Sequence, residues 1–241
     1  MVKEIISKLI AYYRRDFFTE PVLLLTFIIC FFIALMHHRR ERARLFFLFY
    51  FFAGILLFAI SSPFDVLRVF PERNVVALGE LFNTTFELIE FVAFYWFFKK
   101  CLRNHNLQVI LKVFFVCLLA VSTLFFLSLR FPGYTEDNIR VHSLLINVLE
   151  FFFIAFLCLA YFYELLTSTP KINLFHRPSF FIATSAFFYS VLLIPFFIVA
   201  HYMRRNVHPV YFALFSCHYL LLTIMLLTIA KAFLRRQPIT T

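Results

Sequence analysis

Glycine and charged residues are both scarce in this chain. Its 241 residues include only three glycines, Gly54, Gly79 and Gly133. A phosphate-binding loop needs several glycines close together, and a GxxxG seam between membrane helices needs two at a spacing of four, so neither feature is present. Only 15% of the residues are charged, whereas 63% are hydrophobic and the mean hydropathy is +0.87. This composition excludes a soluble domain and predicts a protein that crosses a membrane several times.

Motifs that bring chemistry with them are also missing. The five cysteines lie in or at the ends of apolar stretches, and none has metal-ligand spacing. They are interpreted as small hydrophobic residues, because membrane-embedded cysteines without partners at such spacing rarely form metal sites. Neither an HExxH motif nor an ExxH pair occurs. The sequence therefore assigns no catalytic residue, metal or cofactor, and it favours a binding protein over an enzyme.

Long apolar stretches recur seven times along the chain. Each is long enough to cross a hydrocarbon core of about 30 Å as a helix that rises about 1.5 Å per residue. They cover residues 17–36, 45–62, 79–98, 108–128, 142–163, 178–200 and 209–231. The predicted fold class is an all-α membrane protein, with a seven-transmembrane-helix bundle over residues 17–236 and a short tail at 237–241. Residues 1–16 alternate apolar and basic side chains at helical spacing, which predicts an amphipathic helix in the membrane interface.

The Lys and Arg residues predict an orientation. Thirteen lie in the loops at 37–44, 99–107 and 164–177, at Lys112 and toward the C-terminus, and ten lie on the other side. The positive-inside rule therefore predicts an outside N-terminus and a cytoplasmic C-terminus, in a plasma membrane or bacterial inner membrane. The basic loops favour contact with the lipid bilayer, or with a cytoplasmic or membrane protein partner. Nucleic acid is not needed to explain the net charge of +10.

Four aromatic residues lie near the predicted inner ends of the third and fifth apolar stretches. They are Tyr95, Trp96, Tyr161 and Tyr163. Tyrosine and tryptophan are enriched where membrane helices meet the headgroups, because the ring is apolar and its tip is polar. The sequence predicts that these four side chains form an interfacial belt.

Polar residues interrupt the third apolar stretch on one face. Asn83, Glu87 and Glu90 are spaced i, i+4 and i+7, which places them in one stripe along a helix. An ionisable side chain in the middle of a membrane helix costs roughly 2.5–3.5 kcal/mol on insertion scales and so points to function. The fifth stretch repeats this spacing with Ser143, Asn147 and Glu150.

A histidine in the seventh stretch lies at a similar depth. Glu87, Glu150 and His218 each lie eight to nine residues from the predicted outer end of their helix. At about 1.5 Å per residue this is roughly 12–14 Å below that end. The sequence predicts that these groups meet in a ligand- or proton-binding site composed of Asn83, Glu87, Glu90, Asn147, Glu150 and His218.

Several functions are compatible with such a site. The leading hypothesis is a non-enzymatic sensor or binding protein with an outward-facing polar pocket for a small ligand, ion or proton. The alternatives are a small proton-coupled transporter, a metal-dependent intramembrane hydrolase that uses the carboxylates and histidine as ligands, and a structural subunit of a membrane complex. In the last case the polar groups would simply form hydrogen bonds between helices, at under about 1 kcal/mol each.

Overall fold

The computed structural model describes residues 20–37, 42–67, 72–128, 135–168, 177–204 and 209–234. Over these ranges the chain is almost wholly helical and contains no strand, which confirms the predicted all-α fold. The helices are α2 (Glu20–His37), α3 (Arg42–Leu67), α4 (Glu72–Cys101), α5 (His105–Ser128), α6 (Glu136–Ser168), α7 (Pro178–Arg204) and α8 (Pro209–Leu234). The predicted interfacial helix at 1–16 and the tail at 237–241 lie outside the described residues.

Within the part of the chain that the structure describes, four helices are long and apolar enough to cross a membrane, which indicates a membrane protein. The qualifying segments are His105–Ser128 in α5, Asp137–Thr167 in α6, Pro178–Val199 in α7 and Ser216–Leu234 in α8. Helices α2 and α3 contribute the shorter apolar segments Pro21–Met36 and Leu45–Ala59. Helix α4 contains the predicted polar stripe, which lowers its apolar content.

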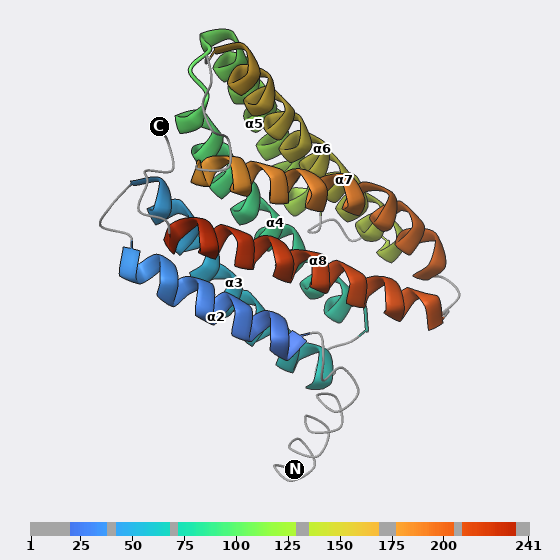
Figure 1. The fold of residues 1–241 in the computed structure, drawn as a ribbon. Coiled ribbons are helices and arrows are strands. Elements are labelled where there is room, and N and C mark those ends of the chain that lie inside the picture. Colours follow the sequence, from blue (N-terminus) through green and yellow to red (C-terminus); the bar gives the residue numbers. More distant parts are fainter. Residues whose placement is uncertain are drawn as a thin grey trace.

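Six of the helices form a closed ring. Each of α2, α3, α4, α6, α7 and α8 packs against the next in that order, and α8 closes the ring by packing against α2. Figure 1 shows α8 between α2 and α7, and α4 behind it. Helices α2 and α8 come from opposite ends of the described chain, so their contact holds the termini of the bundle together. The interior of this ring contains the polar residues described below.

Helix α5 lies outside the ring, against α4 and α6. Its main contact with α4 is Phe115, whose ring centroid is 4.0 Å from that of Tyr95 and 5.4 Å from that of Phe91. Most other apolar side chains of α5 are exposed, including Val113 and Leu124. This exposed surface is compatible with lipid contact, because lipid tails are as apolar as these side chains.

A short loop joins α4 to α5 and is fixed by two polar side chains. Asn104 caps α5, since its Oδ1 accepts the backbone N–H of Asn106 at 2.9 Å. The carboxylate of Glu164, near the end of α6, accepts the backbone N–H groups of Arg103 at 2.7 Å and Asn104 at 3.2 Å. These bonds tie the start of the peripheral helix to the ring.

The predicted aromatic belt is only partly correct. Tyr163 is exposed and Trp96 is half-buried, with the Lys99 ammonium 4.6 Å from the Trp96 ring centroid. Tyr95 and Tyr161, however, are buried in the core of the bundle. Position along a helix is readable from the sequence, but the side on which a residue lies depends on the rotation of the helix against its neighbours.

Gly54 of α3 allows α2 to approach closely. A Cβ atom at this position would lie 2.5 to 2.9 Å from three carbon atoms of the Phe27 ring. Phe27 is fully buried, and its ring contacts those of Tyr50, Phe58 and Phe86 at centroid distances of 5.9, 5.6 and 5.7 Å. The Phe27 ring therefore has little room to move, and only glycine fits opposite it.

We expect Gly54→Ala to lower the free energy of unfolding in detergent. Overpacking costs about 1–3 kcal/mol, whereas the better helix propensity of alanine returns at most about 1 kcal/mol. Shortening the opposing side chain should relieve the clash, so Gly54→Ala should be less harmful in a Phe27→Leu background. The two single variants and the double variant form a thermodynamic cycle. Strictly additive effects would contradict the close approach.

Candidate functional site

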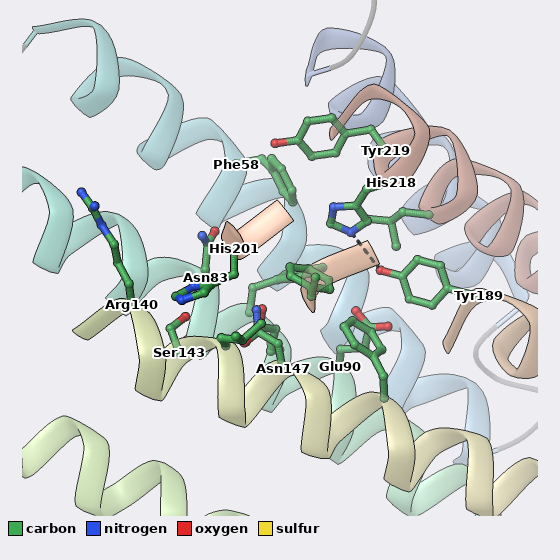
Figure 2. Close-up of a pocket in the computed structure, with 16 residues that line it drawn as sticks. Phe58, Asn83, Glu90, Arg140, Ser143, Asn147, Tyr189, His201, His218 and Tyr219 are labelled. Carbon is green, nitrogen blue, oxygen red and sulfur yellow. Dashed lines mark hydrogen bonds between the residues drawn. The ribbon is translucent and has the colours of Figure 1, made fainter. Parts of the chain in front are cut away.

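A cavity of about 140 Å³ lies within the helix ring, lined by side chains from α3, α4, α6, α7 and α8. Figure 2 shows its polar groups converging from both sides of the bundle. The polar lining residues are Asn83, Glu87 and Glu90 of α4, Arg140, Ser143 and Asn147 of α6, Tyr189 and His201 of α7, and His218 and Tyr219 of α8. The rest of the lining is apolar, and includes Phe58, Phe86, Phe151 and Phe197.

Five of the six residues singled out from the sequence line this cavity: Asn83, Glu87, Glu90, Asn147 and His218. Glu150 is buried but does not belong to the lining. It lies three residues after Asn147, which turns it about 60° around the helix axis. Glu150 nevertheless remains within electrostatic range of Glu87 and Glu90. These three side chains are called the carboxyl cluster below.

The cavity runs from an accessible edge into the interior. Asn83 is exposed, and Arg140 and His201 are half-buried. Glu90 lies two turns further along α4 than Asn83 and is only 1% exposed. A molecule that enters beside Asn83 therefore meets the carboxyl cluster last.

One carboxylate oxygen of Glu90 has a partner and the other has none among the described residues. The Tyr50 hydroxyl of α3 donates a hydrogen bond to Glu90 Oε2 at 3.1 Å. Glu90 Oε1 and Asn147 Oδ1 are buried without a hydrogen-bond partner in this part of the chain. Buried polar atoms are nearly always hydrogen-bonded, so these two atoms point to water or a ligand in the cavity.

His218 lies among aromatic rings on the opposite side of the cavity from α4. Its Nε2 is 3.4 Å from the Tyr189 hydroxyl, the contact dashed in Figure 2. The ring centroids of Phe196, Phe197 and Tyr219 lie 5.4 to 5.6 Å from that of the imidazole. The contact between His218 and Tyr189 joins α8 to α7 at the level of the cavity.

Comparison with known proteins supplies no family. The chain matches no protein-family description, no curated protein and no solved structure. Its function must therefore be argued from the geometry of the site.

A metal centre receives no support from this geometry. Among the side chains that the structure describes, no three His, Cys, Asp or Glu groups are arranged to hold a metal ion. Glu87 and Glu90 approach the cavity from α4, whereas His218 approaches from α8 among aromatic rings. The groups that the hydrolase alternative needs as common ligands are thus not brought together as a metal site among the described residues.

Sequence reasoning missed Tyr50 and Tyr189, which bond to Glu90 and His218. A signal was present, because both tyrosines stand in phenylalanine-rich runs, FFLFYFFAG and AFFYSVLL. A buried tyrosine usually finds a hydrogen-bond partner for its hydroxyl. In a chain with 39 phenylalanines, a tyrosine in the middle of a helix marks a place where that hydroxyl is needed.

Removal of the Tyr50 hydroxyl should destabilise the protein. We expect Tyr50→Phe to lower the free energy of unfolding in detergent by about 1–3 kcal/mol, because Glu90 Oε2 loses its donor. A second change, Glu90→Met, should recover much of this loss by removing the polar group as well. Tyr163→Phe, at an exposed tyrosine of α6, is the control and should change little. Equal effects of Tyr50→Phe and Tyr163→Phe would contradict the buried bond.

Proposed function

We propose that this chain is a seven-span membrane protein that binds a small polar ligand in the cavity of its helix ring, without catalysing a reaction. In this proposal the N-terminus is outside, the C-terminus is cytoplasmic and the cavity opens outward. The observation behind it is the pair of buried cavity-lining acceptors, Glu90 Oε1 and Asn147 Oδ1, that have no partner among the described residues. A ligand or water in the cavity would satisfy both.

The position of the cavity agrees with this orientation. Its lining comes from the N-terminal half of α6, from the middle of α4 and of α8, from the middle and C-terminal part of α7, and from Phe58 of α3. The other end of the bundle contains the exposed pair Lys99 and Lys100, which stabilise the C-terminus of α4 and suit a cytoplasmic surface. The cavity thus lies in the half of the bundle that the Lys and Arg distribution assigns to the outside.

The inner half of the ring is filled by aromatic side chains. Phe47 contacts Phe94, Phe97 and Phe233 at centroid distances of 5.6 to 5.8 Å, and all four are fully buried. A cavity that is open at one end and packed at the other favours a binding protein over a channel. A transporter would have to rearrange this packing in every cycle.

Interhelical bonding alone accounts for only part of the site. The bonds of Tyr50 to Glu90 and of Tyr189 to His218 do join neighbouring helices. Asparagine or serine would form such bonds at a lower desolvation cost than a carboxyl group. The carboxyl cluster therefore needs a further reason, and ligand binding supplies it.

Cysteine labelling tests whether the cavity opens to the outside. In a background without the five native cysteines, Ser143→Cys places a thiol in the cavity lining. We expect a membrane-impermeant, positively charged methanethiosulfonate added to intact cells to label it to completion.

Ser190→Cys is the matched control. Ser190 of α7 is as buried as Ser143, but it is not part of the cavity lining. It should stay unlabelled until the protein is denatured. If Ser143→Cys is equally protected in the folded protein, the cavity is closed, and structural bonding becomes the better account.

A further inference from the structure

The cavity combines carboxyl groups with hydrogen-bond acceptors at its inner end. Glu87 and Glu90 line it, and Glu150 lies within electrostatic range of both. Removing several carboxylates from water is costly unless a cation accompanies them. A cationic ligand would therefore be stabilised beside these carboxyl groups.

The protein supplies little positive charge at that end. Among the described lining residues, Arg140 is the only lysine or arginine. It lies ten residues before Glu150, which is about 15 Å along α6. In Figure 2, Arg140 lies at the left edge of the drawn side chains and Glu90 lies to the right of Asn147. Arg140 donates no hydrogen bond to Glu90 Oε1 or to Asn147 Oδ1, so a ligand can supply the donors for these two atoms.

The two buried atoms that lack partners specify the hydrogen bonds of this cation. Glu90 Oε1 and Asn147 Oδ1 are acceptors, and their side chains are only 1% and 5% exposed. An ionised carboxylate only accepts hydrogen bonds. The complementary ligand group is thus one with several N–H donors.

The apolar part of the lining favours an organic cation over a metal ion. Six aromatic rings line the cavity, from Phe58, Phe86, Phe151, Tyr189, Phe197 and Tyr219. Aromatic faces attract a desolvated ammonium group and also pack against a short alkyl chain. Calcium and magnesium instead prefer a site formed almost wholly by oxygen atoms, whereas aromatic rings make up much of this lining.

We infer that the ligand is a small primary alkylammonium ion. Its ammonium group would bond to Glu90 and Asn147 next to the carboxyl cluster, and its alkyl chain would lie against the aromatic rings. A cavity of about 150 Å³ holds a molecule the size of benzene, so about five or six non-hydrogen atoms fit into this one. This inference rests on the proposed function, because it requires the cavity to admit a ligand.

Three ligands of matched size test the charge requirement. They are n-butylammonium, 1-butanol and butyrate, each titrated at constant ionic strength into the full-length protein in detergent. Any ligand that binds only the folded state raises the unfolding temperature as its concentration increases. We expect a saturable increase with n-butylammonium and none with 1-butanol or butyrate.

Two variants test the contacts. Glu90→Gln keeps the shape and an acceptor for Tyr50 but removes the charge, and it should weaken n-butylammonium binding by at least about tenfold. Asn147→Leu keeps a similar volume and removes the second acceptor, and it should weaken binding by about fivefold. Glu164→Gln removes one carboxylate at the α4–α5 loop, away from the cavity, and should leave the affinity unchanged.

Each contrary outcome has its own meaning. An equal response to 1-butanol would show a cavity that selects for apolar volume, and a response to butyrate alone would show an anion site. Either result overturns the ammonium assignment. Failure of n-butylammonium with Ser143→Cys still labelled from outside overturns only the ligand class, whereas loss of that labelling overturns the proposed function itself.

Discussion

The placement of carboxyl groups inside an aromatic bundle is the constraint on which the rest of this structure depends. A carboxyl group that leaves water needs donors, a cation or retained water, because an isolated ionised carboxylate is very unfavourable in an apolar medium. The helix ring supplies only some of the hydrogen-bond donors that these carboxyl groups need. Tyr50 donates to one oxygen of Glu90, a cavity-lining residue, and the other oxygen is buried without a hydrogen-bond partner among the described residues. The cavity and the buried acids are therefore two aspects of one arrangement.

Phenylalanine makes this arrangement rigid. Rings from neighbouring helices interlock at the end of the ring away from the cavity, and Phe27 packs so closely against Gly54 that no side chain fits there. Close-packed interiors resist small displacements, so the cavity walls are held in position by the packing around them. A preorganised site of this kind loses little conformational freedom when a ligand binds. Helix α5, which packs outside the ring, contributes no side chain to the cavity lining.

The two ends of the ring differ in a way that suits a binding protein. The end that contains the cavity has accessible polar residues at its edge, whereas the other end is packed with rings and followed by exposed Lys99 and Lys100. In the proposed orientation a ligand would enter from outside, and any effect on a partner would arise at the basic inner surface. Interhelical contacts such as that of Tyr189 with His218 link the cavity to α7 and α8.

The sequence by itself determined the local properties of this protein. Apolar stretches and helical spacing predicted all seven described helices. Counting residues from the end of each helix predicted that Glu87 and His218 lie at a similar depth, and both line the cavity. These properties depend on residues that are neighbours in the chain. Only the tertiary structure decided the rotation and position of each helix. That rotation turned Glu150 out of the cavity lining, buried Tyr95 and Tyr161, and brought Tyr50 to Glu90, because these outcomes depend on packing between residues far apart in sequence.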